Sequence, residues 1–195
     1  MAASASTDRS AGFTLVEVLV ALLIIMVMAL GTAQLFAISI RATHAARNQT
    51  ATTALAAQKL EQLRALTWGF DAQGTGLPVS DTTTNLAQDP PTGTGAGLNP
   101  SPTGTLNQNI AGYVDYLDAR GQWVGTGAWP PETAAYIRRW SVEPLATNPN
   151  NTLILQVLVT TVQREDSVVA AGLTGPRRRM ADDAFVVSVK TRKAR

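Results

Sequence analysis

One long uncharged segment near the start of the chain limits what this sequence can fold into. Residues 18–40 contain no charged side chain, and Val18–Leu30 is almost wholly aliphatic. A helix of about 20 apolar residues spans the hydrocarbon core of a bilayer. Only 15% of the chain is charged, against about 25% in an average soluble protein. The segment therefore predicts a transmembrane helix over residues 13–40.

A secretory signal peptide is the alternative interpretation of this segment. The apolar core of a signal peptide has about 7–15 residues and precedes a small-residue cleavage site. Here the apolar run is longer, a glycine boundary at Gly12 lies before it, and Glu17 sits inside its hydrophobic edge. These three differences favour a retained anchor.

The helical pattern continues beyond the membrane segment. No proline occurs from Met1 through Gly76, and small or apolar residues recur at helical spacing along residues 41–68. These residues are Ala42, Ala45, Ala46, Gln49, Thr53, Ala56, Leu60 and Leu63. The polar face is expected to carry Arg47, Gln58, Lys59, Glu61 and Arg64. We expect one helix of roughly 50 residues, about 75 Å long, whose outer part lies close against a sheet.

Residues 69–111 have the composition of a linker. They are rich in Gly, Pro, Thr, Asn and Asp, as in Asp89-Pro90-Pro91-Thr92-Gly93. Long segments without secondary structure are usually functional loops or disordered. We expect poor order there, apart from a short strand or turn.

Residues 112–195 carry the pattern of an antiparallel sheet. Strands are predicted at residues 113–117, 122–124, 136–142 and 153–162. Tyr136, Arg138, Trp140 and Val142 are expected to share one face. Phe185, Val187 and Val189 are expected to form the inner face of a last strand. A helix followed by antiparallel strands predicts an α+β fold in which the helix covers one face of the sheet.

The junction between the polar leader and the helix carries the most specific motif. Gly12-Phe13-Thr14-Leu15-Val16-Glu17-Val18 closely resembles the class III signal of type IV prepilins and type II secretion pseudopilins. The resemblance implies a type IV pilin-like fold and a prepilin leader peptide at residues 1–12. It also implies cleavage between Gly12 and Phe13 by a prepilin peptidase, N-methylation of Phe13, and an assembly or register role for Glu17.

The same resemblance implies a location and a set of partners. The chain is expected to cross the inner membrane once, with its C-terminus outside the cytoplasm, and then to enter a pilus filament. Its partners would be the prepilin peptidase, other major and minor pilins or pseudopilins, the inner-membrane assembly platform and membrane lipid. Glu17 would pair with the free amine of a neighbouring subunit, because an unpaired carboxylate at the edge of a bilayer costs a few kcal/mol.

Two further segments are similar to the minor pilins called PilV. These are Val18–Ile24 and Gln58–Glu61, and the alternation from Tyr136 to Val142 is similar more weakly. The chain has no cysteine, whereas major pilins carry a C-terminal pair. The resemblance implies a minor type IV pilin, a structural subunit for pilus assembly, initiation or the tip, and not an enzyme. A minor pseudopilin of type II secretion and a DNA-uptake (competence) pilin stay open as alternatives.

The other candidate residues are weaker. His44, the only histidine, has no acid or nucleophile beside it in sequence, so we expect a surface position instead of catalysis. Asp115, Asp118 and Glu132 could supply oxygen ligands to calcium, but they form no dense acidic loop. We therefore predict no metal site and no cofactor.

Basic residues gather near the C-terminus. Arg177, Arg178 and Arg179 form one run, and residues 190–195 hold four more basic residues. The simpler interpretation is a solvated loop and a frayed end. Contact with a polyanion such as DNA is the alternative. The net charge of +2 does not favour a basic body built to bind nucleic acid.

Overall fold

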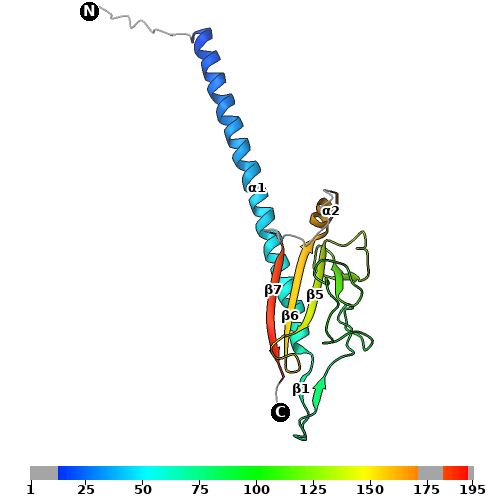
Figure 1. The fold of residues 1–195 in the computed structure, drawn as a ribbon. Coiled ribbons are helices and arrows are strands. Elements are labelled where there is room, and N and C mark those ends of the chain that lie inside the picture. The colour runs from blue at the N-terminus through cyan, green and yellow to red at the C-terminus, as the bar shows by residue number, and fades with distance from the viewer. Residues whose placement is uncertain (1–12, 171–181, 193–195) are drawn as a thin grey trace, which may run out of the picture. The chain divides into compact units, whose positions relative to one another are not determined.

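The computed structural model describes residues 13–170 and 182–192, and its elements follow the predicted α+β order (Figure 1). Helix α1 spans Leu15–Ala65, and a shorter helix, α2, spans Val162–Ala170. The strands are β1 (Trp68–Phe70), β2 (Pro78–Ser80), β3 (Val114–Leu117), β4 (Trp123–Gly125), β5 (Tyr136–Pro144), β6 (Thr152–Thr161) and β7 (Ala184–Thr191). The α+β layout predicted from sequence is therefore confirmed.

The chain divides into two units, residues 1–44 and 45–195. In the first unit the described residues are almost entirely the apolar part of α1. Its large hydrophobic side chains are exposed, from Leu15 at 76% to Ile40 at 57%. No other part of this unit buries them, as expected for a helix whose natural surroundings are apolar.

The second unit is built on a five-stranded antiparallel sheet in the order β4-β3-β5-β6-β7. The outer part of α1 covers one face of this sheet (Figure 1). Its buried residues are Thr52, Ala56, Lys59 and Leu63. Steps of four, three and four residues place these side chains on one side of a helix. They pack with Trp140 on β5 and Val157 on β6, so the main core lies between α1 and the sheet.

The opposite face of the sheet has a smaller core of its own. Val114, Tyr116 and Ile137 are fully buried there, and Val162 at the start of α2 packs against them. The sequence did not predict α2. Its first turn carries Arg164 and Glu165. The helix follows directly on a predicted strand, and no turn residue between them marks where it begins.

The segment expected to be a poorly ordered linker instead contributes to the core. β1 and β2 form a hairpin, and Asn85 bridges Thr92. Leu86, Ala87 and Leu98 are each at most 5% exposed. The polar residues satisfy the backbone locally: the Asp81 carboxylate accepts from the N–H groups of Thr83 and Thr84 at 3.1 and 3.0 Å. These turns bring three apolar side chains into the main core.

The predicted inner face of the last strand is wrong. Ala184 is buried and Val186 packs on the main core, whereas Val187 and Val189 are 52% and 59% exposed. The pairing with β6 sets this face. Val159 and Val157, which lie in the main core, are opposite Ala184 and Val186. Directly opposed residues of an antiparallel pair share one face of the sheet, so Val187 and Val189 lie on the other face.

Candidate functional site

The motif residues lie at the start of α1. Gly12 lies outside the described residues, and Phe13 is 83% exposed. Thr14 caps the helix: its hydroxyl and carbonyl oxygens accept from the Glu17 N–H at 3.3 and 3.1 Å, and its carbonyl also accepts from Val18. Glu17 is exposed in the first turn, where the helix dipole favours a negative charge. The fold thus places an exposed carboxylate one turn from Phe13.

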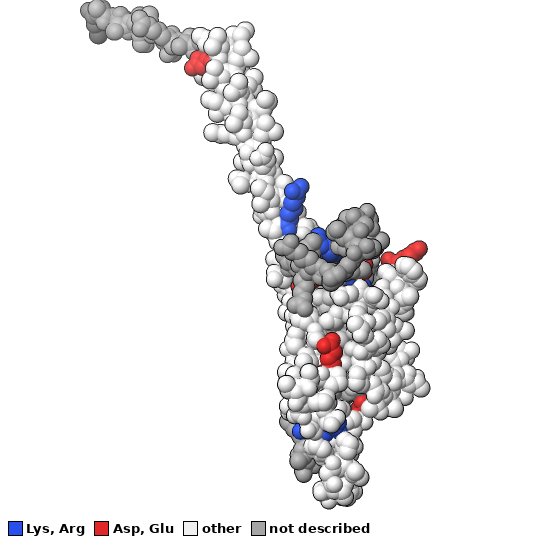
Figure 2. All heavy atoms as spheres, in the orientation of Figure 1, with Lys and Arg blue, Asp and Glu red and all other residues white. Residues whose placement is uncertain are grey.

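An uncharged surface follows this carboxylate along α1. In Figure 2 the beginning of the helix carries acidic atoms, and the stretch after it is almost free of charge. An 18-residue window of α1 reaches a mean hydropathy of 2.6, with no residue of it buried. Within residues 13–170 and 182–192, this is the one helix long and apolar enough to cross a membrane. Such a surface suits lipid tails or the apolar sides of neighbouring helices.

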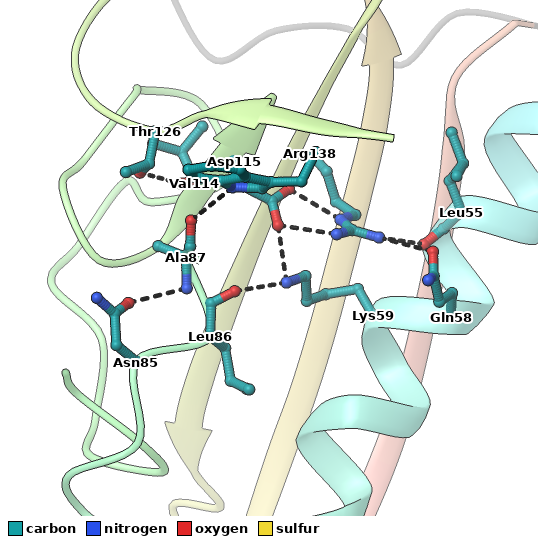
Figure 3. A network of polar contacts seen from close by, with 11 residues as sticks. Leu55, Gln58, Lys59, Asn85, Leu86, Ala87, Val114, Asp115, Thr126 and Arg138 are labelled. Atoms are coloured by element: carbon teal, nitrogen blue, oxygen red, sulfur yellow. Dashed lines mark hydrogen bonds and ion pairs between the residues drawn. The ribbon is translucent and has the colours of Figure 1, made fainter. Parts of the chain in front are cut away.

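A buried ionic cluster joins α1 to the sheet (Figure 3). The Asp115 carboxylate on β3 accepts two hydrogen bonds of 2.8 Å from Arg138 on β5. It also lies 2.8 Å from the Lys59 ammonium on α1. The side chains of all three residues are only 1% exposed. We call Lys59, Asp115 and Arg138 the buried triad.

The remaining polar groups of the triad also have partners. Lys59 donates to the Leu86 carbonyl at 2.6 Å and lies 4.5 Å from the ring centroid of Trp140. Arg138 donates to the Leu55 carbonyl and the Gln58 side chain at 3.3 and 3.2 Å. Burial lowers the pKa of Lys59 to about 8, although the attraction of Asp115 opposes this shift. Two cations share one carboxylate, so the triad and its partners hold together α1, β3, β5 and the loop that contains Leu86.

The sequence did not identify this cluster. Lys59 was expected on the polar face of the helix, and the structure instead buries it. Thr53 was expected on the apolar side, and it is exposed while Thr52 is buried. The spacing of Thr52, Ala56 and Leu63 was the available signal, because Lys59 falls on the same stripe. The partner of Lys59 follows only from the β3–β5 register, which sets Asp115 opposite Arg138.

The carboxylates considered for calcium have other roles. Asp115 belongs to the buried triad, and Asp118 accepts from the N–H groups of Arg120 and Gln122 at 2.8 Å each. Glu132 is exposed on a separate loop. Among the residues that the structure describes, no three His, Cys, Asp or Glu side chains are grouped to hold a metal ion.

The basic end of the chain is partly built into the fold. Lys190 donates to the Arg64 carbonyl in the last turn of α1. The Arg192 guanidinium lies 3.7 Å from the ring centroid of Trp68 and donates to Gly69 O and Ser80 Oγ at 3.3 and 3.0 Å. Arg192 thus fastens the end of β7 to the β1–β2 hairpin, where a frayed tail was expected.

The remaining basic run and the histidine add no further site. Arg177, Arg178 and Arg179 lie outside the described residues, and their contact with a polyanion stays a prediction. His44 is exposed on α1, at the end of the first unit.

Comparison with known proteins supports the motif at the start of the chain. The prokaryotic N-terminal methylation motif matches residues 7–33, which include Gly12, Phe13 and Glu17. No curated protein and no solved structure matches the chain. The motif implies processing by a prepilin peptidase and assembly with other pilins, and the single apolar helix fits a protein that crosses the membrane once. The start of the chain is therefore type IV prepilin-like.

Proposed function

We propose that this chain is a minor type IV pilin, a structural subunit that acts in assembly, initiation or the tip of a pilus. One observation carries the proposal: the methylation motif at residues 7–33 coincides with the start of a helix that has an 18-residue apolar window with no buried residue. A soluble enzyme would bury such a surface in its own core. A filament subunit keeps it for the membrane and then for its neighbours.

The chemistry of the motif residues supports a role in assembly. Cleavage after Gly12 would free the amine of Phe13 at the end of an apolar helix. Glu17 is the one ionisable side chain between Phe13 and Arg41. In a bundle of such helices an unpaired carboxylate is strongly unfavourable, so it favours the one axial position that places it beside the amine of another subunit. The pair would set the register of the subunit in the filament.

The architecture of the second unit supports an accessory subunit. The chain has no cysteine, so no disulfide holds the end of the sheet. The buried triad and the Arg192 contacts hold α1, the hairpin and β7 together instead. This departs from the C-terminal cysteine pair of major pilins and favours a minor pilin over the main shaft subunit.

Mass spectrometry of the membrane-extracted protein tests the proposal. The mature chain should begin at a methylated Phe13, and replacement of Gly12 by leucine should leave the leader in place. Sheared pili should contain the chain in smaller amount than the major pilin. An intact wild-type leader, or a cut beyond Ile40, would refute the assignment. Recovery with a secretion pseudopilus instead of pili would establish the type II alternative.

A further inference from the structure

Strand β7 offers an open edge to another polypeptide. Within the described residues its only strand partner is β6, and the register from Ala184 to Thr191 runs without a bulge. The Arg192 N–H donates to Asn151, which fixes the hydrogen-bonding phase of the pair. Alternate residues in an antiparallel pair direct their backbone groups away from the partner. Val187, Val189 and Thr191 therefore present N–H and C=O groups outward.

The side chains at this edge are apolar and exposed. Val187 and Val189 are 52% and 59% exposed. Natural proteins protect long edge strands with prolines, bulges or outward charges, because an open apolar edge pairs with other chains. β7 has no proline and its described register has no bulge, and its one charged residue, Lys190, donates to the Arg64 carbonyl of α1 and leaves valine at the outward positions 187 and 189. Such an edge is retained where pairing is part of the function.

A small cavity at the end of the edge indicates which chain fits. It has a volume of about 340 Å³ and is lined by Arg64, Trp68, Val189, Lys190 and Thr191. Its wall thus combines an aromatic ring, an apolar side chain and two cations. Arg64 pairs at the surface with Glu61, and their side chains are 53% and 66% exposed. An incoming carboxylate can replace so exposed a partner, because surface pairs contribute little.

We propose that the β7 edge binds an extended, acidic segment of a neighbouring filament subunit as an added strand. The backbone groups of Val187 and Val189 would supply the pairing, and a carboxylate of the segment would enter the cavity beside Arg64. Strand addition explains the open backbone and the exposed valines together, and the exposed Arg64 guanidinium favours an acidic segment. The inference rests on the proposed function, because it names a filament subunit as the partner.

Cysteine labelling of the full chain tests whether the edge is covered. The chain lacks cysteine, so Val187→Cys and Val189→Cys each create a unique thiol. Glu143→Cys is the matched control, because Glu143 is exposed on β5 away from this edge. In sheared filaments a maleimide probe should label both valine positions at least about tenfold more slowly than in detergent-solubilised monomer, and should label the control equally in both. Equal labelling rates at the valine positions would overturn the inference.

A proline variant separates strand pairing from apolar contact. Val187→Pro removes one N–H that β6 does not use, whereas Val187→Ala keeps that N–H and shortens the side chain. Incorporation into filaments should fall at least about tenfold for the proline variant and less than about threefold for alanine. Arg64→Gln should reduce incorporation severalfold. Circular dichroism of the detergent-solubilised variants checks that each folds. If the proline variant does not fold, the cysteine labelling experiment is the deciding test.

The outcomes distinguish this inference from the function on which it rests. Wild-type chain that is absent from the filament fraction would overturn both. Wild-type chain that is present, together with full incorporation of a folded Val187→Pro variant, would overturn only the strand addition.

Discussion

Asp115 is the residue on which the fixation of α1 depends most directly. Its carboxylate lies 2.8 Å from both Lys59 and Arg138, and each of the three side chains is 1% exposed. A buried ion pair contributes little net stability, but removing one partner leaves an uncompensated charge in the interior. The single carboxylate balances two cations, so its substitution should destabilise the fold more than substitution of either cation.

Asp115→Asn should therefore destabilise the fold by about 3–5 kcal/mol. Lys59→Met is the matched control: it keeps the length of the side chain and leaves one cation facing one carboxylate, so its cost should be clearly smaller. Urea unfolding of the full chain in detergent micelles, followed by tryptophan fluorescence, measures both. If the two variants lose the same free energy of unfolding, Asp115 is not the residue on which the triad depends most.

The stability of the fold should increase with pH above about 8. Burial lowers the pKa of Lys59 from its ordinary value of 10.5 to about 8. Between these values the unfolded chain binds a proton that the folded chain has lost, so the free energy of unfolding rises with pH. Below about 8 the contribution of Lys59 does not change with pH. Burial raises the pKa of Tyr116 to about 12, so above pH 10 the tyrosine opposes the trend.

Urea midpoints of the full chain at pH 7, 8, 9 and 10 measure this dependence. The midpoint should be flat near pH 7 and rise between 8 and 10 in the wild type. In Lys59→Met the rise should disappear. If the urea midpoint of Lys59→Met still rises between pH 8 and 10, a group other than Lys59 causes the pH dependence.

Among the elements, β7 is held at its end by a side chain and not by a further strand. Arg192 lies against Trp68 at 3.7 Å and donates to Gly69 and Ser80, which belong to β1 and β2. Stacking on tryptophan contributes about 0.5–2 kcal/mol, and it needs the planar guanidinium. The hairpin and β7 should therefore loosen together when Arg192 is replaced.

Arg192→Ala should accelerate chymotrypsin cleavage beside Trp68 and Phe70 by about 5–30-fold, the factor that corresponds to 1–2 kcal/mol. Arg192→Lys should bring the cleavage rate only part of the way back to the wild-type value, because lysine keeps the positive charge but lacks the planar guanidinium. Arg120→Ala, at an exposed position, is the control and should cleave like the wild type. If Arg192→Lys is cleaved as slowly as the wild type, the positive charge alone accounts for the contact.

The elements that sequence could predict are those with a local signal. An apolar run without breakers sufficed for α1, alternation sufficed for β3 and β5, and a run that is apolar on both sides sufficed for β6. The face of β7 was predicted wrongly because both alternating sets contain valine, and only the register with β6 decides which set faces the core. Lys59 was placed on the wrong side because a long polar side chain is buried only if a partner is present. That partner, Asp115, lies 56 residues away and is placed by strand register.

For the whole molecule, the two ends of α1 serve different surroundings. The described residues before Arg41 expose an apolar surface that carries one acid, and the residues after Ala45 pack on a sheet. The motif at residues 7–33 is local, so the sequence alone sufficed to recognise it. What Glu17 does in an assembly depends on neighbouring subunits, which the sequence of one chain does not specify.

Glu17→Ala should separate membrane insertion from assembly. The substitution removes a charge from an apolar helix, so insertion should be unchanged or improved. Incorporation into filaments should fall more than about tenfold, because the amine of the neighbouring subunit would be buried without its partner. Glu143→Ala, which removes an exposed acid from β5, should affect neither. Membrane fractionation and immunoblotting of sheared pili measure both quantities. Normal incorporation of Glu17→Ala would refute the register role, while processing at Gly12 would remain intact and the methylation motif would need another reason for its glutamate.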